Sequence, residues 1–183
     1  MSTTDKYSGF LEHIQAYLGP VRETEPPTDG YALLFCRTPD DDLASVVTNG
    51  LRFQPITAVL PQELVCTVHA AQRKAAHLIT ALTAELVMKS RRGLVLEQVI
   101  PSPHPLIPHS DIGGVIAAIH PYADDDFDTL HSPGDAAELQ LITLLPATTG
   151  ELLFAEQHGT EALFQRWEAK ETDLLDVFRR SAA

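Results

Sequence analysis

The chain has 183 residues, 44% of them hydrophobic and 21% charged, a composition typical of a globular protein. We expect one domain over residues 1–183, because a chain of this length can bury enough apolar surface to fold without a metal or a disulfide. The formal charge of −12 and the pI of about 4.9 argue against general binding to nucleic acid or to an anionic membrane, since both would repel an acidic chain.

The sequence also sets expectations about compartment. It has no signal-peptide core at its N-terminus and no run of about 18 apolar residues, so we expect a cytoplasmic protein without a transmembrane helix. Cys36 and Cys66 each lie within an apolar run. We expect both to be buried core thiols in a reducing compartment, and not a disulfide framework.

The first predicted helix runs from about Asp5 to Leu18, where apolar residues recur at helical spacing, and Gly19-Pro20 ends it. A polar connection is expected over residues 23–29, so that residues 1–30 form an N-terminal helix and linker. Three strands are predicted next, over residues 31–36, 43–47 and 63–69. The acidic turn Asp40-Asp41-Asp42 separates the first two.

The longest predicted helix covers about Ala71 to Arg91, and Gly93 is suited to follow its end. Its expected apolar stripe consists of Ala75, Leu78, Ile79, Leu82 and Leu86. Further strands are predicted over residues 94–100 and 115–120, separated by a proline-rich segment. We expect an acidic, polar loop from Tyr122 to Asp135.

The last predicted strand starts at Ala137 and ends at Pro146, because proline cannot donate to a strand ladder. Thr148 and Glu151 match a capping box that opens a helix, and His158-Gly159-Thr160 opens another. A final helix is expected to turn three apolar residues inward: Leu174, Val177 and Phe178. Consecutive strands without crossover helices predict an α+β fold with mainly antiparallel pairing.

The acidic loop has part of the spacing of a calcium site. Asp124, Asp126 and Asp128 alternate, and Asp135 is the twelfth residue of the same frame. However, Thr129 stands at the sixth position, where the turn of a calcium loop needs glycine. We therefore favour a solvated acidic loop over a metal site.

Other residue types give no catalytic or cofactor site. Four histidines match no zinc spacing and are interpreted as surface residues: His104, His109, His120 and His131. Cys66 and His69 fall on opposite faces of a predicted strand, which does not suit a nucleophile–base pair. No G-x-S-x-G, glycine-rich phosphate loop or H-E-x-x-H is present. We expect a non-enzymatic protein with no cofactor and no metal.

Three separated blocks resemble the suppressor-of-fused-like (SUFU) domain family. They cover about residues 31–167 and comprise Val46–Leu51 with its Thr-Asn-Gly turn, Pro61–Val65 with its Glu-Leu, and Leu141–Pro146 followed by Thr149-Gly150-Glu151 and His158-Gly159. One departure is Arg52, where the family usually carries a small polar residue.

The resemblance implies a mixed, mainly antiparallel sheet packed with helices, as in a short bacterial member of the family. Many such members are regarded as immunity proteins, which bind and neutralise one toxin without chemistry of their own. A basic toxin domain would suit the acidic chain. We expect its binding surface to include the acidic segments: Asp40, Asp41, Asp42, Asp124, Asp125, Asp126 and Asp128.

Two other functions remain open from the sequence. One is an intracellular regulatory domain that captures an extended peptide by strand addition. The other is an unrecognised hydrolase or metal-binding protein, which would need a cleft with converging carboxylates or histidines.

Overall fold

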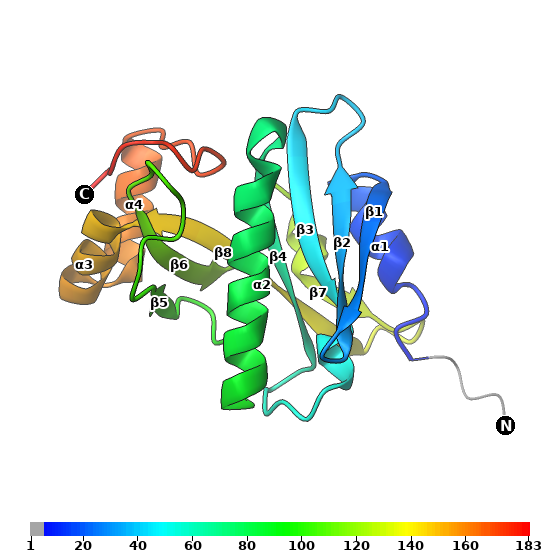
Figure 1. The fold of residues 1–183 in the computed structure, drawn as a ribbon. Coiled ribbons are helices and arrows are strands. Elements are labelled where there is room, and N and C mark those ends of the chain that lie inside the picture. Colours follow the sequence, from blue (N-terminus) through cyan, green and yellow to red (C-terminus); the bar gives the residue numbers. More distant parts are fainter. Residues whose placement is uncertain (1–5) are drawn as a thin grey trace, which may run out of the picture.

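The computed structural model describes residues 6–183 and shows a twisted sheet with helices packed on both faces (Figure 1). The helices and strands follow in the order α1 (Phe10–Leu18), β1 (Val21–Thr28), β2 (Tyr31–Arg37), β3 (Leu43–Asn49), η1 (Leu51–Phe53), β4 (Gln62–His69), η2 (Ala70–Gln72), α2 (Arg73–Ser90), β5 (Val99–Pro101), β6 (Ile112–Ala118), η3 (Asp125–Asp128), β7 (Thr129–His131), β8 (Ala137–Thr148), α3 (Thr149–His158) and α4 (Thr160–Ala169).

The strand order across the sheet is β1-β2-β3-β4-β8-β6-β5, and the short strand β7 pairs with β8 beyond the end of β6. All neighbours are antiparallel except β4 and β8, which run parallel from Gln62 opposite Gln140 to Val65 opposite Thr143. The α+β prediction, with a mixed and mainly antiparallel sheet, is confirmed.

Alternating side chains divide the core between the two faces of the sheet. Leu64, Cys66 and Val68 of β4 belong to the cluster under α2, whereas Val65 belongs to the cluster under α1. A third cluster, around Trp167, joins α3 and α4 to β6 and β8. Because strand side chains point to opposite faces in turn, one strand contributes to two cores.

The two cysteines lie in different clusters, Cys66 under α2 and Cys36 under α1. Both are free and buried, and burial raises the pKa of each thiol to about 12. Such thiols stay protonated and act as small apolar core residues. The interpretation as core residues is confirmed.

The expected polar connection over residues 23–29 is wrong, because Val21–Thr28 forms the edge strand β1. β1 pairs with β2 from Val21 opposite Cys36 to Thr28 opposite Tyr31, with two irregularities in register. Its side chains after Val21 are exposed, so no apolar alternation marks it in the sequence. Backbone pairing to one neighbour is sufficient for an edge strand.

Three other boundaries differ from expectation. Of residues 94–100 only the last two are in a strand, β5, and the loop from Tyr122 to Asp135 contains η3 and β7. Pro146 lies inside β8, opposite Val115. β4 pairs with β8 only up to Thr143. At Pro146 the edge of β8 that faces away from β6 therefore has no strand partner, and a missing N–H donor on that edge breaks no ladder hydrogen bond.

The chain after Ala169 forms no helix within the described residues, so the expected final helix is wrong. Val177 is buried as expected, but Phe178 is exposed. The expected helix start near Asp5 lies outside the described residues, and α1 begins at Phe10. No helix in residues 6–183 combines the length and apolar character needed to cross a bilayer.

Candidate functional site

α2 carries a row of large apolar side chains that the sheet does not cover. Leu78, Leu82 and Leu86 recur every fourth residue and are 36%, 43% and 45% exposed. Their expected place in the buried stripe is wrong, although Ala75 and Ile79 of that stripe are buried. The residues facing the sheet are mostly small or β-branched: Ala75, Ala76, Ile79, Thr80, Thr83, Ala84 and Val87. Small side chains allow a close approach of helix and sheet, which leaves the neighbouring leucine row at the surface.

A groove of about 450 Å³ lies along this leucine row. Its other side is the segment Ile100–Leu106, which includes three prolines, and Val115 of β6 completes the lining. Glycine at position 114 permits the pairing of β5 with β6, since a Cβ there would lie 2.3 Å from the carbonyl oxygen of Ile100. We call the leucine row and the segment Ile100–Leu106 together the α2 groove.

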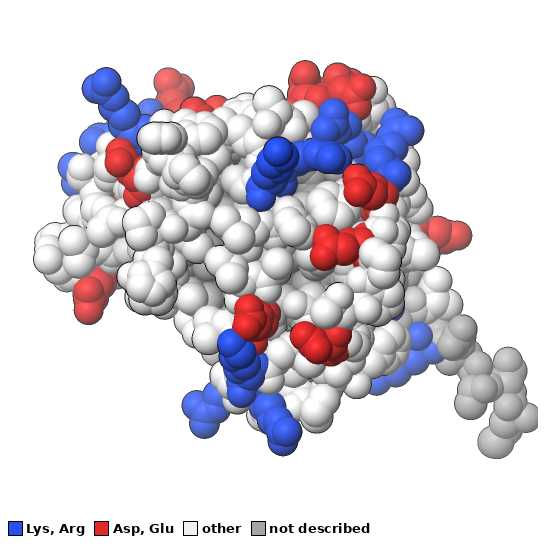
Figure 2. All heavy atoms as spheres, viewed as in Figure 1, with Lys and Arg blue, Asp and Glu red and all other residues white. Residues whose placement is uncertain are grey.

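The α2 groove is apolar, and charge gathers at its ends. Figure 2 shows an uncharged area over the middle of α2 and beside it, with Lys and Arg atoms above it and both acidic and basic atoms below it. His104 is the one titratable residue in its lining, and it is exposed. Acid–base catalysis needs positioned titratable groups, so this lining suits contact with apolar side chains.

Glu63 organises a second region, where charge is buried. Its side chain is fully buried, and it accepts hydrogen bonds from the Thr48 hydroxyl and from the backbone amides of Gly50, Leu51 and Arg52. The Arg52 guanidinium pairs with it at 2.6 Å. Burial raises the pKa of the Glu63 carboxyl, and the donors from Thr48, Gly50 and Arg52 oppose that rise. We call these residues the Glu63 cluster.

The Glu63 cluster explains why Arg52 is tolerated at the turn. The guanidinium carbon of Arg52 lies 4.3 Å from the ring centroid of Phe10 and 4.5 Å from that of Phe53. Gly50, which starts this turn, has φ of 129° and a Cβ there would lie 2.8 Å from the carbonyl oxygen of Gly30. Arg52 therefore fixes α1 to the turn, which is a structural role.

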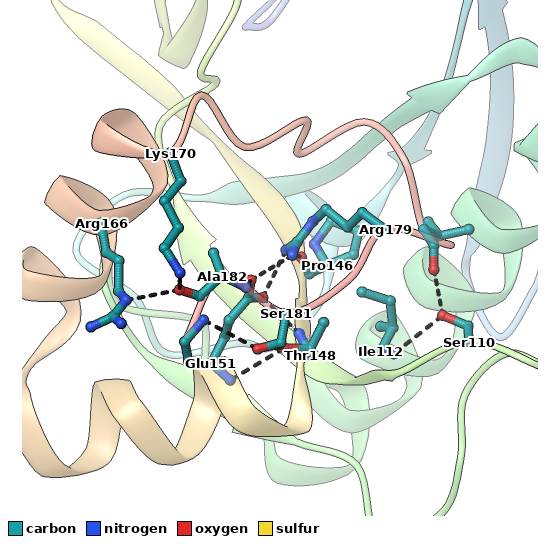
Figure 3. A network of polar contacts seen from close by, with 12 residues as sticks. Ser110, Ile112, Pro146, Thr148, Glu151, Arg166, Lys170, Arg179, Ser181 and Ala182 are labelled. Atoms are coloured by element: carbon teal, nitrogen blue, oxygen red, sulfur yellow. Dashed lines mark hydrogen bonds and ion pairs between the residues drawn. The ribbon is translucent and has the colours of Figure 1, made fainter.

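Glu151 organises a matching region at the other end of the sheet (Figure 3). The predicted capping box is present: the amide of Glu151 donates to the Thr148 hydroxyl, and the Glu151 carboxylate accepts from the Thr148 amide. Arg179 binds the same carboxylate with both terminal nitrogens, at 2.5 and 2.8 Å. The Ala182 amide donates to it at 2.9 Å. We call these residues the Glu151 cluster.

The Glu151 cluster fixes the C-terminal segment to the sheet. Arg179 also donates to the carbonyl of Pro146, while Arg166 and Lys170 of the α4 region donate to the carbonyl of Ala182 (Figure 3). Burial opposes ionisation of Glu151, but the bonds from Arg179 and the amides hold the pKa of this carboxyl below its ordinary value. The sequence predicts the cap from two residues three apart, but not Arg179, which lies 28 residues further along the chain.

The residues expected to bind a partner lie in two segments, and no hydrogen bond or ion pair of the described chain joins the segments. Asp40, Asp41 and Asp42 are exposed in the turn between β2 and β3, where Asp40 accepts from the Thr38 hydroxyl. In the second segment, three residues are exposed: Asp124, Asp125 and Asp126. Asp128 is half-buried and accepts from the His120 amide, so it also has a structural contact.

The histidine interpretation is wrong for His120. This side chain is buried, with Nδ1 accepting from the amides of Tyr122 and Ala123 and Nε2 lying 3.0 Å from the Thr67 hydroxyl. Burial lowers its pKa to about 4. His104, His109 and His131 are exposed as expected. Residues 6–183 contain no group of three or more His, Cys, Asp or Glu side chains placed to hold a metal ion.

The chain matches the model of one protein family. The model of the Suppressor of fused protein (SUFU) family covers residues 25–180. The chain belongs to the suppressor of fused family. The blocks that carry the sequence resemblance meet in space, since Thr48 and Gly50 of one block contact Glu63 of the next. The third block forms β8 and the Glu151 cap.

Solved structures with this fold have low sequence identity to the chain. A protein described as a SUFU homolog from Neisseria gonorrhoeae FA 1090 is 18% identical, with a TM-score of 0.75 over 98% of this chain and 97% of that one. A chain of the Sufu–Fu complex is 12% identical, with a TM-score of 0.68 over 97% and 92%. No curated protein matches the sequence.

Suppressor of Fused from Drosophila also has this fold. It is 13% identical, with a TM-score of 0.57 over 82% of this chain and 42% of that one. The present chain thus matches less than half the length of the Drosophila protein. At these identities, the likenesses establish the fold.

Proposed function

We propose that this chain is a non-enzymatic protein-binding domain and that the α2 groove is its main binding surface. The exposed row of Leu78, Leu82 and Leu86 beside an apolar groove carries the proposal. Contiguous apolar surface is costly in water and marks sites where another protein packs. Family membership supports the proposal, because a related chain was solved in the Sufu–Fu complex.

More specifically, we propose that the chain is an immunity protein that binds and neutralises a bacterial toxin in the cytoplasm. Such a protein needs a stable scaffold and a complementary surface, and it acts by covering the toxin's active site. The charge of −12 supports a basic partner. Two acidic segments, the exposed Asp40–Asp42 and the exposed Asp124–Asp126 with the half-buried Asp128, would attract that partner and increase its association rate.

Capture of an extended peptide by strand addition has less support. Addition needs an open sheet edge with free N–H and C=O groups. β1 contains Pro26 and Pro27 and has two irregularities in register, features that blunt an edge. β5 is only three residues long and ends in Pro101. β7, which pairs only with β8, is also only three residues long. These edges therefore favour a partner that contacts side chains over one that pairs with the strand backbone.

Co-expression tests the immunity proposal. The toxin domain encoded beside this gene is produced with the chain, and growth and co-purification are measured. We expect wild-type protein to restore growth and to co-purify with the toxin. Leu82→Glu should lose both effects, because it places a charge in the α2 groove. Leu153→Glu is the matched control, since Leu153 is 52% exposed on α3, outside the groove. Unchanged toxicity in the presence of wild-type protein would refute the immunity role.

A further inference from the structure

A second hollow, of about 380 Å³, lies between the end of β6 and the end of α4. Ile119 and Tyr122 line it from the β6 end, and Phe164 and Trp167 line it from α4. Ile119 and Tyr122 are 53% and 52% exposed, so the hollow opens to solvent. It shares no lining residue with the α2 groove. We call it the α4 pocket.

Aromatic rings form much of the α4 pocket. Phe164 and Trp167 stack with their ring centroids 5.4 Å apart and their planes at 27°. Trp167 is buried, and the guanidinium of Arg179 already lies 5.7 Å from its ring centroid. The more accessible rings of Tyr122 and Phe164 are therefore the aromatic surfaces offered to a ligand. Aromatic faces attract cations through their quadrupole.

The rest of the lining includes two carboxylates and no basic side chain. Glu168 and Glu171 are exposed residues of the α4 pocket, whose lining contains no Lys, Arg or His. Within residues 6–183, neither carboxylate takes part in an ion pair or a side-chain hydrogen bond. Their charge is thus available to a positively charged group from outside.

The turn that carries these carboxylates is fixed by the backbone. Glu171 has φ of 47°, a left-handed conformation that is uncommon for a residue other than glycine. Its amide donates to the carbonyl of Glu168 at 3.0 Å, and the Thr172 amide donates to that of Trp167 at 2.9 Å. The backbone that carries both side chains is therefore fixed before a ligand binds, which lowers part of the entropy cost of binding.

We propose that the α4 pocket binds an arginine side chain of a basic protein partner. The apolar stem of arginine suits contact with Ile119, and its planar guanidinium stacks on aromatic rings and forms paired hydrogen bonds with carboxylates. Lysine is more strongly hydrated and lacks the planar fork, so it fits less well. The inference rests on the proposed protein-binding function and adds a chemical requirement for the partner at a different surface.

Trp167 provides a direct test, because it is the only tryptophan of the chain. The full chain is titrated with acetylated, amidated hexa-arginine, and Trp167 fluorescence and its indole N–H resonance are followed. Hexa-citrulline, which lacks the charge, serves as the peptide control. We expect saturable binding of hexa-arginine, a response at Trp167, and no response to hexa-citrulline.

The double variant Glu168→Gln/Glu171→Gln separates this site from general attraction to an acidic protein. We expect it to weaken hexa-arginine binding by about fivefold or more, because two charge-assisted contacts are lost. Glu12→Gln/Glu156→Gln removes the same charge from exposed positions on α1 and α3, and its affinity should stay within about twofold of wild type. Equal losses in both double variants, or no binding by the wild type, would overturn the proposal.

Failure here is distinguishable from failure of the proposed function. Leu82→Glu alters the α2 groove and leaves the α4 pocket intact, so it should bind hexa-arginine like wild type. If hexa-arginine fails to bind but the toxin partner is still lost in Leu82→Glu, the α4 pocket proposal is refuted and the α2 groove proposal stands.

Discussion

The glutamate clusters and the α2 groove depart in opposite ways from the usual placement of charge outside and apolar groups inside. Glu63 and Glu151 are fully buried with their oxygens bonded, whereas three leucines of α2 stay exposed beside a groove. The clusters hold the N-terminal helix and the C-terminal segment to the sheet. The leucines of the α2 groove do not fix one segment of the described chain to another. The difference separates groups that stabilise the fold from groups available to a partner.

The two clusters also differ from each other. The pKa of Glu151 is held below its ordinary value by Arg179 and by backbone amides. That of Glu63 is raised by burial, despite bonds from Thr48 and Arg52. Arg179 also binds Glu151 with two nitrogens, whereas Arg52 binds Glu63 with one, so loss of the charge should cost more at Glu151.

The largest effect is expected for Glu151→Gln. The change leaves the guanidinium of Arg179 buried without its carboxylate and weakens the capping box, which should cost about 3–5 kcal/mol of unfolding free energy. Urea unfolding followed by circular dichroism measures it. Glu156→Gln, an exposed position on the same helix, is the control and should stay within about 0.5 kcal/mol. Equal stability of the two variants would mean that the cluster does not stabilise the fold.

The next effect is a loss of stability in acid caused by His120. Its folded pKa of about 4 lies below the ordinary value of 6.5, so the unfolded chain takes up the proton first. Stability should therefore fall as the pH falls from 6.5, by roughly 3 kcal/mol at pH 4. Glu151 adds a further loss below its ordinary pKa of 4.5, because its folded pKa is lowered.

Unfolding free energies of wild type and His120→Gln between pH 7 and pH 4 isolate the histidine contribution. The variant should be less stable at pH 7 and should lose much less stability between pH 7 and pH 4.5. If both proteins lose stability equally over that range, His120 is not buried in its neutral form.

Glu63→Gln should have a smaller effect, about 2 kcal/mol. The amide keeps the shape and still accepts some of the hydrogen bonds, but it loses the charge that faces Arg52. Thermal and urea unfolding of Glu63→Gln beside Glu151→Gln measure the difference directly. A greater loss at Glu63 than at Glu151 would reverse the comparison between the clusters.

What the sequence predicted depended on the range of each interaction. The capping box was visible because Thr148 and Glu151 are three residues apart. The sequence did not predict that Glu63 collects hydrogen bonds. Three of its donors are backbone amides, and every residue type except proline has a backbone amide, so no residue pattern marks them. The exposed edge strand β1 has no apolar alternation, and β7 has only three residues.

The α2 groove was missed for a different reason. Two apolar rows run side by side on this helix, one rich in Ala and Thr and one of leucines. Hydropathy alone favours the leucine row as the buried one. The small row faces the sheet instead, and only the closeness of the packing decides between them.

The smallest stability effect is expected for Leu82→Ser. Leu82 is 43% exposed, so its replacement should change the unfolding free energy by no more than about 0.5 kcal/mol. Leu144→Ala, a fully buried position in β8, should cost about 2–5 kcal/mol in the same assay. A large loss in Leu82→Ser would place the leucine row in the core and remove it as a binding surface.

The most direct test of the account is the affinity of the α2 groove for its partner. The protein captured from the source organism by the immobilised chain and identified by mass spectrometry is purified and titrated calorimetrically. We expect Leu82→Glu to raise the Kd by about tenfold or more, because a central apolar contact is lost. Leu153→Glu should match wild type, since Leu153 lies on α3 away from the groove. Equal Kd values for wild type and both variants would contradict the α2 groove as the binding surface.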